Sequence, residues 1–251
     1  MQLQSRTGRS LVGGGPVREA TNVDERRGFL KAAAGIAVFP AVALAKGNDK
    51  KGKEHEEEDV GAAEDLMREH GVLNRALLVY EEGLRRLRAK EEVPPDVFHA
   101  TASLVKKFVE DYHERLEERF IFPAFERKKK LEDLVKVLKK QHEAGRVLTA
   151  RILQSASPDR FVKEDARTAL VADCEAFIRM YRPHEAREDT VLFPALHSVL
   201  GAKEVKNLGE QFEKEEDKLF GEGGFERVVE QVGGIEKQLG IHELDRFTPK
   251  V

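Results

Sequence analysis

Apolar residues recur at helical spacing along most of the chain between about Val60 and Ala202. They stand at positions i, i+3, i+4 and i+7 and seldom alternate with polar ones, which predicts amphipathic helices rather than strands. Prolines, glycines and polar turns divide this segment into helices expected at 61–90, 96–128, 131–154 and 161–200. Long helices with short connections favour an all-α fold, an up-down-up-down four-helix bundle.

The apolar stripes of the second and fourth predicted helices contain ionisable residues. The stripe of 96–128 reads Ala102, Val105, Val109, His113, Leu116, Glu117 and Phe120. The stripe of 161–200 reads Leu170, Cys174, Phe177, Tyr181, His184, Glu188, Val191 and Ala195. A spacing of four residues puts each His on the same helix face as the Glu that follows it. We therefore expect both His/Glu pairs to point into the core.

The same residue order occurs twice, which indicates a duplicated helical hairpin. The first copy reads His113, Glu114, Glu117, Phe122, Pro123 and Ala124, and the second, 71 positions later, reads His184, Glu185, Glu188, Phe193, Pro194 and Ala195. His70 and His142, 72 positions apart, lie on the apolar stripes of the first and third helices. Each hairpin thus has one His on its first helix and an HExxE box on its second. The prolines are expected to kink their helices.

Six inward ionisable side chains need compensation inside a core. A buried carboxylate without a partner is costly, and it is compensated by pairing, proton sharing or metal coordination. A lone core histidine is more often simply hydrogen-bonded, but four imidazoles and two carboxylates in a two-fold pattern predict two metal ions with the Glu side chains between them. Imidazole and carboxylate ligands suit iron, manganese or zinc. Cys174, the single cysteine, is expected to be a buried small hydrophobe.

Composition excludes several classes of protein. The 251 residues are 40% hydrophobic and 35% charged, which fits a folded chain rather than a disordered one. Lys and Arg number 43 against 46 Asp and Glu, so no excess of positive charge favours nucleic acid as a partner. One cysteine excludes a disulfide framework and a cysteine-based metal cluster.

The first 45 residues resemble a twin-arginine export signal. RRGFLK at 26–31 precedes the weakly apolar run AAAGIAVFPAVALA, which is shorter than the roughly 20 residues of a membrane span. The alternatives are a short buried helix or a membrane anchor, but Pro40 interrupts the run. Small residues at Ala43 and Ala45 predict cleavage after Ala45, so we expect a periplasmic or otherwise exported protein that uses the twin-arginine machinery and has no stable membrane span. A charged linker follows at 46–59.

Four motifs together resemble the hemerythrin-like (HHE) family over about residues 60–200, within a predicted four-helix domain at 60–202. They are REH at 68–70, YHERLEERFIFP at 112–123, QHEAGR at 141–146 and PHEAREDTVLFP at 183–194. The resemblance implies a four-helix bundle around two non-haem irons, bridged by carboxylates, that handles O2 and in some members NO, peroxide or iron itself. Transferred to this chain, His70, His113, His142 and His184 would be terminal ligands, and Glu117 and Glu188 would be bridges.

One position departs from that family pattern. Oxygen-carrying members have a fifth His one turn after the third-helix ligand, where this chain has Arg146, and arginine cannot ligate a metal. Glu114, Glu185 or water could take the vacated position. A carboxylate there would favour ferric iron, which argues against simple reversible O2 carriage. The ferritin-like proteins are another class of carboxylate-rich bundle, and they have a Glu-x-x-His motif on two helices. This chain has the motif once, at Glu110 and His113, while Tyr181 stands three residues before His184, so the class fits only half of the repeat.

The remaining candidates concern the surroundings of the site. Tyr112, Tyr181 and Arg146 are either residues that orient the ligands or ordinary side chains at the core edge. We interpret the other histidines as solvated or structural: His55, His99, His197 and His242. Residues 203–251 are expected to form a C-terminal extension of one or two short helices around GEGG at 221–224.

We thus expect an exported protein with a non-haem di-iron centre for O2, NO or peroxide binding, sensing or iron handling, and we favour a metal- and oxygen-binding protein over an enzyme. The alternatives are a di-iron oxidase or peroxidase, and a metal-free helical interaction module whose His and Glu residues form a buried hydrogen-bond network.

Overall fold

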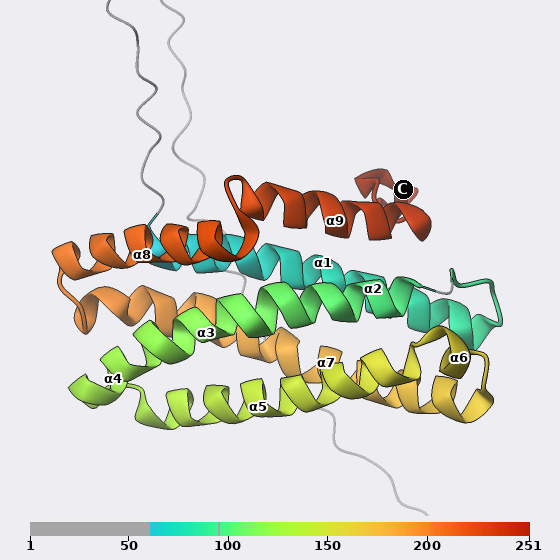
Figure 1. The fold of residues 1–251 in the computed structure, drawn as a ribbon, viewed down its shortest axis with the longest axis horizontal. Helices are drawn as coiled ribbons and strands as arrows, with labels where there is room; N and C mark the ends of the chain where they lie inside the picture. Colours follow the sequence, from blue (N-terminus) through green and yellow to red (C-terminus); the bar gives the residue numbers. More distant parts are fainter. Residues whose placement is uncertain (1–60, 95) are drawn as a thin grey trace, which may run out of the picture. The chain divides into compact units, whose positions relative to one another are not determined.

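The computed structural model describes residues 61–94 and 96–251, and within these ranges every regular element is helical. The expected signal segment, 1–45, and the linker, 46–59, lie outside the described residues. Helical stretches from four parts of the chain lie side by side in Figure 1. The all-helical prediction is therefore confirmed for the described part of the chain.

The first two stretches follow the predicted ranges closely. Helix α1 spans Ala62–Ala89, with acidic residues in its first turn and basic residues in its last, an arrangement that complements the helix dipole. It ends at Lys90, which adopts a left-handed conformation. The second stretch is unbroken and consists of α2 (Val97–Leu104), π-helical η1 (Val105–His113), α3 (Glu114–Leu116), π-helical η2 (Glu117–Ile121) and α4 (Phe122–Lys128).

The last two stretches complete the bundle. Helix α5 spans Glu132–Ser155. The short helix α6 (Pro158–Phe161) precedes α7 (Glu164–Arg187), π-helical η3 (Glu188–Leu192) and the 3-10 helix η4 (Phe193–Ser198). The expected fourth helix began at 161, but Lys163 has extended backbone (φ −90°, ψ 139°), so α7 starts only after it.

Both Phe-Pro pairs directly follow a π-helical segment. Segment η2 ends just before Phe122 and Pro123, and η3 ends just before Phe193 and Pro194. Proline has no N–H for the carbonyl four residues earlier, and its ring crowds that carbonyl. A wider turn relieves this conflict, and such π turns occur often at functional sites.

The π turns change which side chains face the core. A π turn holds an extra residue relative to α-helical spacing, so the buried face moves on by one position. Ile121 and Leu192 are fully buried, whereas Val191 is 38% exposed. The prediction that Val191 faces the core is therefore wrong, because it extended the helical spacing through η3.

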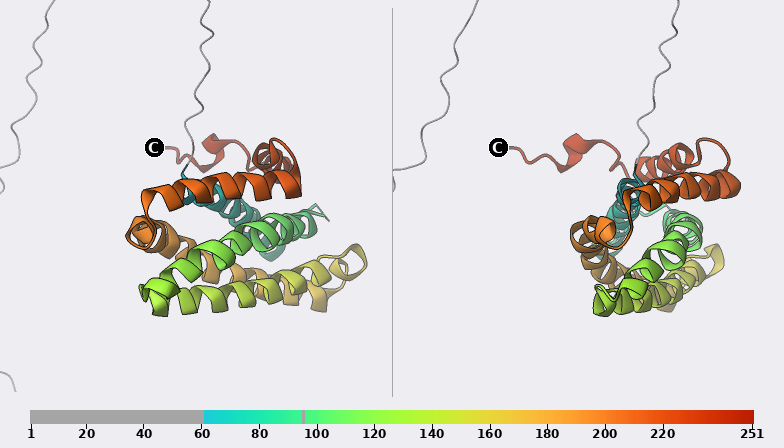
Figure 2. Two further views of the ribbon diagram at one scale, coloured as in Figure 1. Left: turned by 60° about the vertical axis from the view of Figure 1, so that its left-hand side comes forward. Right: turned by 90° about the vertical axis from the view of Figure 1, so that its left-hand side faces the viewer.

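The C-terminal extension packs against the bundle as a pair of helices. Helix α8 (Ala202–Phe220) contacts α1, and α9 (Gly224–Gln238) contacts α1 and α2 (Figure 2). A short 3-10 helix, η5 (Leu244–Phe247), follows. Phe212 and Val232 are fully buried in the interface. Arg75 on α1 donates to both oxygens of Glu236 on α9, at 2.8 and 2.6 Å.

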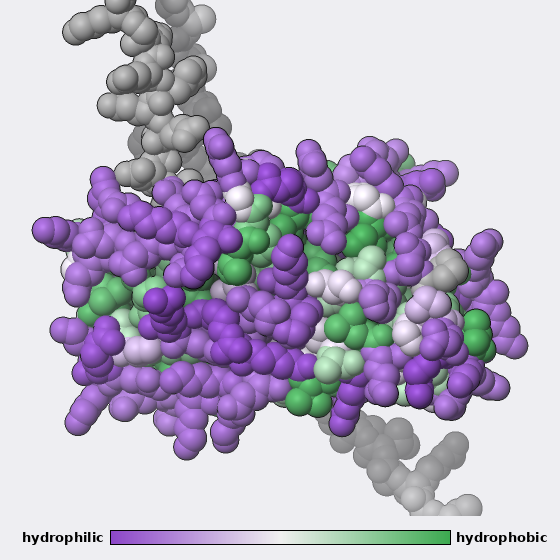
Figure 3. Space-filling model, viewed as in Figure 1, coloured by the Kyte–Doolittle hydropathy of each residue, from purple (hydrophilic) through white to green (hydrophobic). Residues whose placement is uncertain are grey.

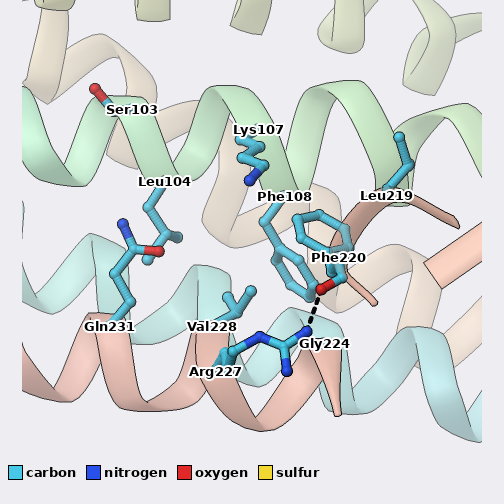
Figure 4. Close-up of a pocket in the computed structure, with 10 residues that line it drawn as sticks. All are labelled: Ser103, Leu104, Lys107, Phe108, Leu219, Phe220, Gly224, Arg227, Val228 and Gln231. Carbon is cyan, nitrogen blue, oxygen red and sulfur yellow. Dashed lines mark hydrogen bonds between the residues drawn. The ribbon is translucent and has the colours of Figure 1, made fainter. Parts of the chain in front are cut away.

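A surface pocket lies where this extension meets α2 and η1 (Figure 4). Arg227 donates to the backbone carbonyl of Phe220 and so holds the turn between α8 and α9. Gly221 and Gly223 in that turn have φ of 75° and 68°, a conformation that glycine adopts without strain. The pocket is lined by Ser103, Leu104, Lys107, Phe108, Leu219, Phe220, Gly224, Arg227, Val228 and Gln231.

The face shown in Figure 3 is mostly hydrophilic, with small hydrophobic patches among the hydrophilic residues. Among the helices that the structure describes, none combines the length and the apolar character needed to cross a membrane.

Candidate metal centre

Six ionisable side chains from four helical stretches converge inside the bundle. They form two groups, His70 with His113 and Glu117, and His142 with His184 and Glu188, and the potential ligand atoms within each group lie within 4.8 Å of one another. All six residues are at most 4% exposed. The sequence predicted that these six side chains point into the core.

Each glutamate lies between a histidine of one group and a histidine of the other. Glu117 places Oε1 3.8 Å from His113 Nε2 and Oε2 3.4 Å from His142 Nε2. Glu188 Oε2 is 3.4 Å from His70 Nε2 and 3.1 Å from His184 Nε2. Each carboxylate is thus within reach of potential ligand atoms of both groups.

The centre contains polar atoms that nothing in the protein satisfies. Within the described part of the chain, neither oxygen of Glu117 nor of Glu188 has a hydrogen-bond partner, and His142 Nε2 also has none. Such atoms are costly in a core unless protons or cations compensate them. Four imidazole nitrogens and two carboxylates fit iron, manganese or zinc as ligands.

The opposite nitrogen of every one of these histidines is fixed by a polar partner. Each Nδ1–H donates to a carboxylate or amide oxygen, which turns Nε2 toward the centre and makes it a better ligand. The four contacts are His70 to Asp189 Oδ1 at 2.7 Å, His113 to Glu69 Oε2 at 2.6 Å, His142 to Glu118 Oε1 at 3.2 Å, and His184 to Gln141 Oε1 at 3.0 Å.

These four partners were missed by the sequence analysis, although the repeat contains a signal for them. Glu69 and Gln141 directly precede the histidines of α1 and α5, and Glu118 and Asp189 directly follow the two inward glutamates. Each pair therefore occupies equivalent positions in the two hairpins. A search of the repeat for polar acceptors next to the candidate ligands would have found all four.

Protons take the place of cations in the metal-free cluster. Burial opposes the charged form of His142, but the adjacent carboxylates of Glu117 and Glu118 outweigh it and raise the pKa of His142 to about 10. Burial likewise opposes a charged His70, yet the hydrogen bond with Asp189 and the adjacent Glu188 carboxylate raise its pKa well above the usual value. For His113, burial dominates and lowers the pKa to about 4.

Metal binding is therefore expected to strengthen as pH rises. His70 and His142 hold protons at neutral pH in the metal-free protein, and each must release its proton before it can ligate. Because the pKa values of both histidines are raised, protons compete strongly with the metal for Nε2 at low pH. This competition weakens as the pH approaches the pKa of each histidine, which is about 10 for His142. We expect the Zn²⁺ affinity to rise about 10- to 100-fold per pH unit between about pH 6 and 8, for one to two released protons. Competition with a chromophoric chelator of known pH dependence measures this. An affinity independent of pH would contradict it.

Glu114 lies beside this centre and is engaged by two other side chains. Its Oε1 accepts a hydrogen bond from the Tyr181 hydroxyl at 2.7 Å, and its Oε2 is 2.8 Å from Arg146 Nη2. Glu114 also forms a group with Glu118 and His142 in which possible ligand atoms lie within 4.8 Å of one another. Burial raises the pKa of Glu114 to about 7.

The second hairpin has a matching arrangement at Glu185. Glu185 Oε2 accepts a hydrogen bond from Asn74 at 2.5 Å, and burial raises its pKa to about 7. Asn74 and Arg146 occupy equivalent positions, 72 apart in the repeat. Arg146 also donates to Glu118 Oε1 at 2.6 Å, so the residue at the fifth-His position holds two carboxylates at the edge of the centre.

Gly145 makes room for Tyr181 next to Glu114. A Cβ at position 145 would overlap the Tyr181 hydroxyl and lie 2.8 Å from its Cζ. We expect Gly145→Ala to lower the free energy of unfolding by about 1–3 kcal/mol, the usual range for overpacking. Gly71→Ala is the control, because nothing lies within 4 Å of its added Cβ; it should stabilise the helix by about 0.5–1 kcal/mol. Urea denaturation of both variants compares them, and equal stabilisation would contradict the prediction.

The other candidate residues lie away from the six-residue cluster. Cys174 is fully buried, and burial raises the pKa of its thiol. His99 and His197 are exposed, and His242 Nδ1 donates to Glu236 at 3.0 Å. His55 lies outside the described residues.

Comparison with known proteins agrees with this geometry. The profile of the hemerythrin HHE cation binding domain matches residues 61–196, which include all six convergent side chains, and the chain therefore belongs to this family. The chain is 47% identical over 221 residues to uncharacterized proteins of Mycobacterium bovis and Mycobacterium tuberculosis, covering 86% of this chain and 87% of each relative. No solved structure matches it.

Proposed function

We propose that residues 60–202 form an up-down-up-down bundle of two duplicated hairpins that holds two non-haem irons for reaction with O2, NO or peroxide. The observation that supports this most strongly is the placement of Glu117 and Glu188, each between a histidine of one group and a histidine of the other. His70, His113, His142 and His184 would be the terminal ligands. Manganese and zinc have the same ligand preferences and are the alternatives for the metal.

Bound iron would supply the electrons and the open coordination positions that a small oxidant needs. The protein supplies orientation and a dry environment. The Nδ1 contacts of the four histidines fix their ring orientations, and the buried apolar stripes above and below exclude water.

Arg146, Glu114 and Tyr181 form the polar edge of the proposed centre. The Arg146 guanidinium and the Tyr181 hydroxyl hold Glu114 from both sides. Arg146 therefore occupies the position of a ligand in oxygen carriers but acts as a hydrogen-bond donor. This favours a centre that reduces or senses its ligand over one that only carries O2. It is also the observation that favours the second candidate function, a di-iron oxidase or peroxidase.

We further propose that the protein is exported through the twin-arginine machinery, with residues 1–45 as the signal and 46–59 as a linker, and works in the periplasm or outside the cell. The RRGFLK motif at 26–31 supports this proposal. Replacement of Arg26 and Arg27 by lysine should keep the protein in the cytoplasm, which fractionation with an antibody measures. Unchanged export would contradict it.

Mixing the iron-loaded protein, reduced under anaerobic conditions, with O2 tests the proposed chemistry. On each mixing with O2, we expect a single rapid change in the near-ultraviolet and visible absorption. The amount of O2 consumed should be proportional to the amount of bound iron. Full reversal under argon over many cycles would identify an oxygen carrier and contradict the role given to Arg146. Sustained turnover with a reductant would favour the enzyme. The absence of any spectral change would contradict the proposed function as a whole.

A further inference from the structure

A second group of acidic side chains lies beside the six-residue centre, between α1 and α8. Asp65, Glu69 and Glu216 each offer a carboxylate oxygen, and these oxygens lie within 4.8 Å of one another. Helix α8 contacts α1 (Figure 1). The family profile ends at residue 196, so Glu216 comes from the C-terminal extension rather than from the family domain.

Glu69 faces both sites with different oxygens. Its Oε2 accepts the hydrogen bond from His113 Nδ1 at 2.6 Å. Its Oε1 is buried and, among the residues that the structure describes, has no hydrogen-bond partner. Because Glu69 is only 2% exposed, water does not readily supply the missing donor.

Tyr112 brings a second unsatisfied polar group to the same place. The residue is 1% exposed, and its hydroxyl has no hydrogen-bond partner in the described ranges 61–94 and 96–251. The charges of Glu69, Asp65 and Glu216 all act on the Tyr112 phenol, so the phenol lies near the three carboxylates. Glu69 is its neighbouring acceptor, but the two groups do not reach the geometry of a hydrogen bond.

The surroundings leave this negative charge largely unbalanced. Arg68 Nη1 approaches Asp65 at 3.5 Å, but the Arg68 side chain is 42% exposed and its guanidinium lies over the Phe225 ring. Glu216 Oε1 accepts the Phe225 backbone N–H at 2.7 Å. The three carboxylate oxygens lie within 4.8 Å of one another, and a cation placed among them would relieve their mutual repulsion.

We propose that Asp65, Glu69 and Glu216, with the Tyr112 hydroxyl, bind a divalent cation that prefers oxygen ligands, separate from the metals of the six-residue centre. Carboxylate and phenol oxygens without imidazole suit Mn²⁺, Fe²⁺ or Ca²⁺. Asp65 and Glu216 are half-buried, which gives a cation a path from solvent. Because Glu69 also accepts from His113, occupancy of this site is linked electrostatically to the neighbouring centre.

Mn²⁺ titration of the metal-depleted full-length protein tests this site. Bound Mn²⁺ is counted by the loss of the free-ion electron paramagnetic resonance signal. The variant is Glu216→Gln, which keeps the acceptor for Phe225 N–H and removes the charge. Glu210→Gln is the matched control on the exposed side of the same helix. Asp65→Asn is a second variant on α1, and circular dichroism checks the fold of all of them.

We expect Glu216→Gln and Asp65→Asn each to bind about one Mn²⁺ fewer per chain than the wild type, or to bind it at least about 10-fold more weakly. Glu210→Gln should match the wild type. Equal stoichiometry and affinity in wild type and both site variants would overturn the proposal, and so would an equal loss in the control.

The same titration separates this proposal from the proposed function. A chain with Glu117→Gln and Glu188→Gln lacks the carboxylates of the six-residue centre but keeps Asp65, Glu69 and Glu216. If this variant still binds Mn²⁺ and loses it on addition of Glu216→Gln, the oxygen-ligand site stands whatever the fate of the iron proposal. If it binds none, the oxygen-ligand site is overturned.

Discussion

A chain with Glu117→Gln and Glu188→Gln is expected to purify with almost no iron. Both glutamates lie between the two histidine groups, so the double substitution removes the ligands that both cations would share. Mutation of a residue that only hydrogen-bonds to a metal ligand lowers the metal affinity roughly 10- to 100-fold. Removal of the two carboxylates that would ligate the metals themselves should lower the affinity further. Elemental analysis of protein grown in iron-replete medium measures the effect.

The matched control for this pair is Glu110→Gln. Glu110 lies in η1 and, like Glu117 and Glu188, is fully buried. In the described part of the chain neither of its oxygens has a hydrogen-bond partner. It belongs to neither group of convergent ligands. The Glu110 variant should therefore retain its iron. If the double variant kept its iron as well, Glu117 and Glu188 would not be ligands.

Removal of the metal is expected to lower the melting temperature by on the order of 10 °C. A ligand present at about 1,000 times its Kd stabilises the native state by about 4 kcal/mol. In a domain of this size, 1 kcal/mol shifts the midpoint by roughly 2–4 °C. The physical reason is that a cation neutralises carboxylates which otherwise lack hydrogen-bond partners in the core.

Calorimetry before and after treatment with a chelator, and again after return of Fe²⁺, measures this shift. The Glu117 and Glu188 double variant is the control, since it retains only the separate group of Asp65, Glu69 and Glu216, and its melting temperature should respond to both treatments much less than that of the wild type. A wild-type melting temperature insensitive to the chelator would instead favour the metal-free interaction module, in which hydrogen bonds alone stabilise the His and Glu residues.

The spacing of His and Glu residues was sufficient to predict the six-residue cluster. An i to i+4 pair lies on one helix face whatever the neighbouring helices do, so His113 with Glu117 and His184 with Glu188 could be placed from the sequence. His70 and His142 could then be placed in the same core, because they occupy equivalent positions of the repeat on the apolar stripes of the first and third helices.

Other features depended on geometry that local spacing does not contain. Val191 turned outward because η3 widens the helix before Pro194, and the pattern of apolar residues assumed an unbroken α-helix. Glu216 joins Asp65 and Glu69 only because α8 packs back along α1, a contact between residues far apart in sequence. Such long-range contacts are set by packing of whole helices, which helical periodicity does not specify.

Iron content combined with the Mössbauer spectrum of the protein purified from its own cells shows whether the bundle holds a pair of irons. We expect about two irons per chain, present as a coupled pair whose signal changes on reduction with dithionite. A folded protein that contains no transition metal, or a single isolated iron, would contradict it.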